Sequence, residues 1–479
     1  MLQAKTSPTA TIQPTVGLSP TVVDFAGLGD AIRSYLADRG ESLRWFPANF
    51  KIVSLELVDL FEDELGGTDL AIVSLDGIEG CYRGVFAFSC DRDGTNPKGL
   101  VEVFDTFDPE LLDRFLVRLR FFGPGRQIVF EALARGDAGV TARPLILDQT
   151  NSAFAFGDFG FGKLYRLCSN HDREARLYGY LSESSAVGRY FGSFQDARGT
   201  VIATVIERLK NPQSFWELAV PLVGRAARKI HSIEARQLEE LVATAAGLLG
   251  TLHDDLYVAQ QQNGAVTTVT DDEVASWIQA RLNAHRASQS LRAKVGNETL
   301  LHLDDGIRAL RGPWLSFEIH GDFHLGQIVQ SDAGPKVIDF EGEPISSYGQ
   351  LDLAQRDLAG LLRSIGYLCS AANSPGIDPI DLNFTLRLVA IRTYGESKIG
   401  TNLLSDPDAV ALTGYLEVEK ALYELVYETR YRPAMVSVPL EFIRRISPRL
   451  SEIAASASKA SGSLGSEGLR RLIAKEYAH

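Results

Sequence analysis

The chain has 479 residues, more than one ordinary hydrophobic core organises, so two or three packed units are expected. Its net charge of −13 excludes a general attraction to nucleic-acid phosphates or to anionic lipid. No apolar run reaches the roughly 18 residues of a membrane span, so neither nucleic acid nor a membrane is expected as a partner. The cysteines form no C-x-x-C pair, which favours reduced thiols in a cytoplasmic protein over a disulfide framework: Cys81, Cys90, Cys168 and Cys369.

The first half of the chain alternates short apolar runs with turn-forming residues. Residues 1–20, rich in Thr, Pro, Ser and Gln, predict a flexible leader. Residues 21–125 predict a small α+β unit, with helices at 22–38 and 109–121 and strands at 52–60, 69–75 and 80–89. Residues 126–209 predict a strand-rich unit, with strands at 143–147, 153–156, 160–167 and 201–207 and a helix at 172–181.

Helical spacing dominates the second half, from residue 210 to residue 455. The predicted helices are 215–224, 234–260, 271–287, 301–310, 351–371, 379–399, 408–430 and 439–455. Two short strands interrupt them, one before His320 and one at 336–339, and a Ser/Gly-rich tail follows at 456–479. A cap subdomain, a sheet-rich N-lobe and a mostly helical C-lobe are the outline of a bilobal, protein-kinase-like α+β fold.

The segment His320-Gly321-Asp322-Phe323-His324-Leu325-Gly326-Gln327 carries the strongest chemical pattern. Asp322 stands two residues after His320 and five before Gln327, the separations of the H-x-D-x-x-x-x-N catalytic loop. In-line phosphoryl transfer requires an aligned hydroxyl, cations on the phosphates and carboxylates that hold those cations. Asp322 is the predicted catalytic base and His324 a second catalytic candidate, whereas His320 either anchors the loop or contacts the substrate.

Three oxygen-bearing side chains are predicted to bind Mg²⁺. Gln327 stands where the pattern more often has Asn. Asp339 follows an apolar strand and corresponds to the metal-binding Asp of D-F-G, and Glu341 stands two residues later. Hard oxygen ligands suit Mg²⁺. Each segment alone is also typical of a turn or a helix cap, but their order and spacing favour a phosphotransferase that uses ATP and Mg²⁺.

The nucleotide is expected to bind the preceding strand-rich unit. The small polar residues at 149–153 predict a turn over the phosphates, with Ser152 as its candidate ligand. Lys163 on a strand and Glu174 on the next helix are expected to pair as in kinases, although a solvated edge lysine has the same local pattern. The segment 206–209 is the predicted hinge, where adenine would meet the backbone of Glu207 and Leu209.

Four blocks of the chain resemble bacterial maltokinases, relatives of the aminoglycoside-phosphotransferase and choline-kinase group. The blocks are 42–46 with Lys51, 149–156 with 163–166, 319–327 with 338–344 and 356–364, and 419–433. The resemblance implies transfer of phosphate from ATP to maltose, giving maltose 1-phosphate for α-glucan synthesis. The chain departs from the family at 47–50 and between Pro344 and Arg356, and glucosamine kinases share much of the same scaffold.

The last block predicts a sugar-binding helix face, because Lys420, Glu424 and Tyr427 stand at i, i+4 and i+7. Charged groups would bond sugar hydroxyls and the aromatic ring would cover a C–H face, whereas the alternative is a solvated Lys–Glu pair. Asp357 and Arg430 are further substrate candidates. A glucosamine kinase, an aminoglycoside phosphotransferase and a non-catalytic nucleotide-binding scaffold remain as alternatives. A monomer or weak dimer is expected, with possible contact to a pathway enzyme.

Overall fold

The computed structural model describes residues 25–40, 50–61, 68–77, 80–90, 97–106, 108–127, 142–145, 151–168, 172–229, 231–286, 310–343, 353–371 and 380–446, with positions 43, 46, 129, 295, 307 and 308. The predicted leader, the Ser/Gly-rich tail and most of the helix predicted at 301–310 lie outside these residues. Gln149 and Thr150 of the predicted phosphate turn also lie outside them.

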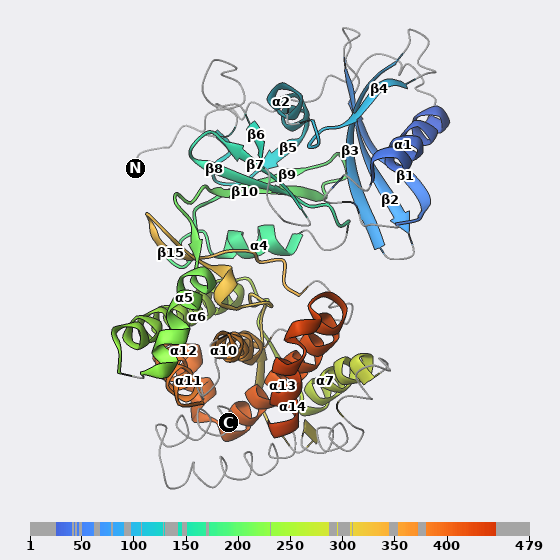
Figure 1. Cartoon of the computed structure of the whole chain (residues 1–479). Helices are drawn as coiled ribbons and strands as arrows, with labels where there is room; N and C mark the ends of the chain where they lie inside the picture. The colour runs from blue at the N-terminus through green and yellow to red at the C-terminus, as the bar shows by residue number, and fades with distance from the viewer. Residues whose placement is uncertain are drawn as a thin grey trace, which may run out of the picture.

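The N-terminal unit is a four-stranded antiparallel sheet with a helix on one face (Figure 1). Its strands, in sheet order, are β1 (Ile52–Phe61), β2 (Asp69–Gly77), β3 (Gly80–Cys90) and β4 (Pro97–Glu102). Helix α1 (Phe25–Arg39) buries Leu28, Ile32 and Leu36, which recur every four residues and therefore share one face against the sheet. Only the edge strand β4 was not predicted.

The second unit is a six-stranded antiparallel sheet in the order β5-β9-β10-β8-β7-β6. The strands are β5 (Arg120–Phe122), β6 (Ala142–Leu145), β7 (Ser152–Phe156), β8 (Gly160–Leu164), β9 (Tyr190–Gln195) and β10 (Val201–Glu207). Helices α2 (Pro109–Arg118) and α4 (Asp172–Tyr180) accompany it. The helix predicted to reach residue 121 ends earlier, because Leu119 is extended (φ −85°, ψ 159°) and turns the chain into β5. Strand β9 was not predicted.

The two sheets share one hydrophobic core and a short stretch of backbone pairing. Arg83 in β3 donates its N–H to the carbonyl of Arg166, and Cys168 donates to that of Cys81 at 2.9 Å. The Arg166 guanidinium bonds Glu102 at 2.7 Å, with both side chains fully buried. Because β5 belongs to the six-stranded sheet although it precedes residue 125, the predicted boundary at 125 does not separate the sheets.

The C-terminal lobe is a bundle of helices below the sheets in Figure 1. Its helices are α5 (Phe215–Arg228), α6 (Ile233–Gln262), α7 (Asp271–Arg286), α10 (Ala354–Ser370), α11 (Ile380–Tyr394), α12 (Lys398–Ser405), α13 (Pro407–Tyr431) and α14 (Ser437–Ile446). The single helix predicted at 379–399 is two helices, because the chain turns after Tyr394 and Ser397 caps α12.

Two small sheets lie in the same lobe: β11 (Gln213–Ser214) with β14 (Ile328–Ser331) and β15 (Gly334–Val337), and β12 (Thr267–Val269) with β13 (Trp314–Ser316). Strand β14 was not predicted. The arrangement is the bilobal, protein-kinase-like α+β fold expected from the sequence. Among the described helices, none is both long enough and apolar enough to cross a bilayer.

Candidate active site

The loop at 320–327 joins β13 to β14, and Asp357 of α10 holds its first residues. The Asp357 carboxylate accepts the backbone N–H groups of His320 and Gly321 at 2.8 Å each, and His253 of α6 contacts it at 3.1 Å. Burial alone would raise the pKa of Asp357, but the hydrogen bond from His253 and those from the loop hold it below its usual value. The carboxylate is 1% exposed and positions the loop from behind, and its predicted substrate contact stays a prediction.

His320 links the loop to the segment that carries Asp339. Its ring is fully buried, Nε2 lies 2.9 Å from the carbonyl oxygen of Ile338, and Nδ1 accepts the N–H of Asp322 at 3.3 Å. These bonds fit the anchoring alternative, and the substrate contact predicted for His320 stays a prediction. Gly321 between them has φ +85°, and a Cβ there would meet Arg173 at 3.1 Å, so only glycine suits this turn.

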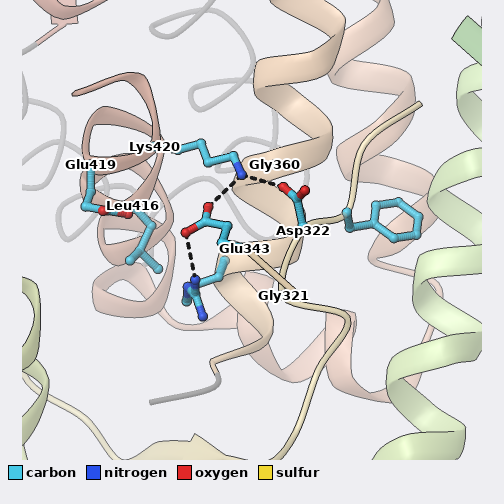
Figure 2. Close-up of a pocket in the computed structure, with 9 residues that line it drawn as sticks. Gly321, Asp322, Glu343, Gly360, Leu416, Glu419 and Lys420 are labelled. Atoms are coloured by element: carbon cyan, nitrogen blue, oxygen red, sulfur yellow. Dashed lines mark hydrogen bonds and ion pairs between the residues drawn. The ribbon is translucent and has the colours of Figure 1, made fainter. Parts of the chain in front are cut away.

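Asp322 is joined to Lys420 of α13 and, through it, to Glu343 (Figure 2). Lys420 Nζ donates to Asp322 Oδ1 at 2.7 Å and to Glu343 Oε1 at 2.6 Å. Glu343 also accepts from Arg281 at 2.7 Å and lies 3.5 Å from Arg356. Burial alone would raise the pKa of Glu343, but these three cations, Lys420 first, hold it well below its usual value. Glu343 therefore keeps its charge and holds Lys420 beside the predicted base.

Glu343 was not among the predicted site residues. The chain does contain it in the run Asp339-Phe340-Glu341-Gly342-Glu343, but only the fold brings it to Lys420, which is 77 residues away. The only local signal for Glu343 was its position two residues after Glu341, a predicted metal ligand.

A cavity of about 580 Å³ opens beside Asp322. Of the predicted residues, Asp322, His324, Lys420, Glu424 and Tyr427 line it. The other lining residues are Ser214, Trp216, Glu217, Gly326, Gly360, Ser364, Tyr367, Tyr423, Glu428, Arg432 and Met435.

His324 and Glu424 differ in what they do at this wall. His324 Nε2 lies 3.9 Å from Asp322 Oδ2, and burial lowers its pKa. The ring is therefore inclined to the neutral form at pH 7. Glu424 accepts two hydrogen bonds from Arg363, at 3.1 and 2.6 Å, which fix its carboxylate. Arg430 is not among the residues that line this cavity, and its guanidinium lies over the Tyr431 ring at 5.2 Å, so its substrate contact stays a prediction.

Lys163 lies among three carboxylates where the two lobes meet. Its Nζ is 2.6 Å from Asp339 Oδ1 and 3.3 Å from Glu174 Oε2, and it also contacts Glu341. Burial alone would lower the pKa of Lys163, but Asp339, Glu174 and Glu341 raise it well above its usual value. Burial raises the pKa of Glu174 to about 7, although Lys163 opposes the shift. The predicted pairing of strand lysine and helix glutamate is thus present in the fold.

Two of the three predicted Mg²⁺ ligands, Asp339 and Glu341, contact this lysine, and the third, Gln327, contacts Asp339. Gln327 Nε2 donates to Asp339 Oδ2 at 3.1 Å, so a turn of the amide would direct its oxygen to the same place. Asp339 has φ +67°, a left-handed conformation that costs energy in a non-glycine residue and aims its carboxylate at Lys163. Among the described residues, no three His, Cys, Asp or Glu side chains form a closed metal cage. Two carboxylates and an amide oxygen fit Mg²⁺ that takes its other ligands from phosphate and water.

The remaining nucleotide candidates are already bonded within the fold. Ser152 Oγ accepts from Arg166 at 2.8 Å, and the Glu207 N–H donates to the carbonyl of Arg189 at 2.7 Å. The predicted nucleotide contacts of Ser152, Glu207 and Leu209 stay predictions. Asn151, which was not singled out, donates from Nδ2 to Glu341 at 2.6 Å and ties the phosphate turn to the metal candidates.

No protein-family model matches the chain. Among curated proteins it is similar to glucosamine kinase from Mycolicibacterium smegmatis (strain ATCC 700084 / mc(2)155), at 24% identity over 330 residues, covering 64% of this chain and 78% of that protein. It is also similar to glucosamine kinase from Streptacidiphilus jiangxiensis, at 27% identity over 341 residues, covering 66% and 76%.

Among solved structures, a glucosamine kinase in complex with glucosamine, ADP and inorganic phosphate superposes with a TM-score of 0.58. The sequences are 21% identical, and the match covers 83% of this chain and 95% of that one. A second crystal form of glucosamine kinase gives a TM-score of 0.60 at 20% identity, covering 84% and 96%. These likenesses establish the fold. The acceptor has to be argued from the cavity.

Proposed function

We propose that the chain is an ATP-dependent carbohydrate kinase whose acceptor is an amino sugar of the glucosamine class. The observation that carries the proposal is the alignment of two charge clusters at the junction of the lobes. Lys163 with Asp339 and Glu341 forms the phosphate and metal side, and Asp322 with Lys420 forms the acceptor side. His320 connects the two, because its ring accepts the N–H of Asp322 at Nδ1 and has Nε2 2.9 Å from the carbonyl oxygen of Ile338.

The chemistry follows from this arrangement. The acceptor hydroxyl oxygen attacks the γ-phosphorus of ATP, the bond from that phosphorus to the bridging oxygen breaks, and ADP leaves. Asp322 orients the hydroxyl and takes its proton. Mg²⁺ would be held by Asp339, Glu341 and the amide oxygen of Gln327, and would supply positive charge that stabilises the phosphates. Carboxylates balance the positive charge of Lys163 in this structure. As the nucleotide binds, Lys163 would leave one of these carboxylates and contact phosphate oxygens instead.

The amino sugar is favoured over maltose for two reasons. Two curated proteins and a solved structure to which the chain is similar are glucosamine kinases. The cavity wall also carries four carboxylates and two cations, which suits a substrate ammonium. The carboxylates are Asp322, Glu217, Glu424 and Glu428, and the cations are Lys420 and Arg432.

The test is a coupled ADP-release assay with Mg-ATP and, separately, glucosamine, maltose, choline and an aminoglycoside. Stimulation by glucosamine that is lost in Asp322→Asn is the expected result. Stimulation by choline alone, or by none of the four, would refute the proposed acceptor class. The mass of the product identifies a phosphorylated sugar independently of ATP consumption.

A further inference from the structure

The cavity beside Asp322 continues along α13 well beyond the reacting end. The α13 residues that line it recur at i, i+3, i+4, i+7 and i+8: Lys420, Tyr423, Glu424, Tyr427 and Glu428. Glu428 stands eight residues after Lys420, which is about 12 Å along the helix at 1.5 Å per residue. One pyranose ring at Asp322 is shorter than this separation. The volume of about 580 Å³ lies within the roughly 300–1,000 Å³ typical of small-molecule sites.

The far end of this wall holds a carboxylate with an unused oxygen. Glu428 is 1% exposed, and its Oε1 accepts from Arg432 at 2.6 Å and from the Tyr367 hydroxyl at 3.4 Å. Its other oxygen, Oε2, accepts no hydrogen bond from any residue that the structure describes. A buried carboxylate oxygen without a donor is unfavourable, so a donor supplied by a ligand would be bound with a gain in free energy.

The other carboxylates of the cavity are committed elsewhere. Glu217 accepts from the backbone N–H and the hydroxyl of Ser214 in the cap of α5, and Glu424 is fixed by Arg363. Asp322 is bonded to Lys420. Glu428 is therefore the acidic side chain of this cavity best placed to accept a new donor at a distance from the reacting centre.

Aromatic rings lie next to this carboxylate. Tyr427 lines the cavity and is 37% exposed, its ring stacks on that of Tyr423 with centroids 6.4 Å apart, and Arg432 lies over it at 5.4 Å. An exposed ring of this kind covers the apolar C–H face of a sugar. Arg432, whose side chain is 58% exposed, forms the outer rim and pairs with Glu428 at 2.6 Å. We call Tyr427, Glu428 and Arg432 the distal subsite.

We propose that the distal subsite binds a second sugar ring that carries an ammonium group, so that the preferred acceptor is an amino disaccharide or longer rather than a free monosaccharide. This inference rests on the proposed function and names its substrate class more closely. The ring at Asp322 presents the hydroxyl, and the second ring lies on Tyr427 with its ammonium at Glu428 Oε2. A neutral disaccharide fills the same space without the charge.

The test compares kcat/KM for glucosamine, its β-1,4-linked dimer and maltose in the wild-type protein and in Glu428→Gln. We expect the wild-type protein to favour the dimer over both others by about tenfold or more, in line with a charge-assisted contact. Glu428→Gln should raise KM for the dimer by a similar factor, and by a larger factor than it raises KM for glucosamine. Tyr427→Ala, at a position that is 37% exposed, should show the same difference between the two substrates.

Glu441→Gln is the matched control, because Glu441 is an exposed carboxylate on α14 that pairs only loosely with Arg445 at 3.5 Å. It should change none of these constants. Phosphorylation of glucosamine with no preference for the dimer would overturn the distal subsite and leave the proposed function intact. Equal efficiency with maltose would overturn the ammonium requirement, and turnover of none of the three would overturn both proposals.

Discussion

Replacing Glu343 with Gln removes the charge that holds Lys420 and Arg281 in the buried cluster beside Asp322. Glu343 is 8% exposed and makes ion pairs of 2.6 and 2.7 Å with these two cations. Removing one partner of a buried ion pair costs about 3–5 kcal/mol, because the remaining charge stays desolvated. Gln keeps the shape of Glu and one acceptor oxygen, so we expect a loss of unfolding free energy at the low end of this range, about 3 kcal/mol. For a cooperative unit of ~200 residues, this lowers Tm by roughly 6–12 °C.

Differential scanning calorimetry at pH 7 measures the effect, with Glu441→Gln as the exposed control, for which less than about 0.5 kcal/mol is expected. The folded pKa of Glu343 lies below its ordinary value of 4.5. Its contribution is therefore present above pH 4.5 and is lost as the pH falls further, so the gap between wild type and variant should narrow there. A Glu343→Gln loss no larger than that of the control would refute the view that this carboxylate stabilises the cluster.

Three further predictions concern the reacting groups. Asp322→Asn should lower kcat by about 10²- to 10⁴-fold in the ADP-release assay while ADP binding by calorimetry stays within twofold, and a loss of binding instead would contradict the role of base. Lys163→Met should weaken ATP binding by roughly 10- to 100-fold, the worth of a charge-assisted phosphate contact, and unchanged binding would exclude that contact. Glu174 has a folded pKa of about 7 against an ordinary 4.5, so its stabilising contribution is lost as the pH rises through 7. The difference in Tm between Glu174→Gln and wild type should accordingly shift in favour of the variant as the pH rises from 4.5 to 7. A Tm difference that stays constant over this range would contradict the raised pKa.

Local patterns predicted most of the helices and buried strands, because apolar spacing and cap residues act within a few positions of the chain. The omissions include the edge strand β4, the short strand β14 and the interior strand β9, whose formation depends on partner strands as well as on their own residues. The helix predicted at 109–121 was too long at its C-terminal end for a related reason. Phe121 continues the apolar spacing of α2, yet it pairs with Phe194 of β9.

The residues of the candidate site show the same difference between local and long-range signals. Asp322, Asp339 and Lys163 were singled out because their spacing follows a known chemical pattern. The place of Glu343 beside Lys420, and the loop-holding bonds of His320 and Asp357, depend on burial and long-range pairing, which the local sequence does not show. Asp357 accepts the N–H of His320, which lies 37 positions earlier in the sequence. The predicted oligomeric state and contact with a pathway enzyme stay predictions.

The seam between the two sheets has a mechanical consequence. Backbone pairing of Arg83 with Arg166, the buried ion pair of Arg166 with Glu102 and the shared core leave no plane along which the sheets can slide. If the six-stranded sheet rotates over the helical lobe, the N-terminal four-stranded sheet and α1 must rotate with it. A fluorophore on the outer face of α1 would therefore magnify and report that rotation from outside the active site.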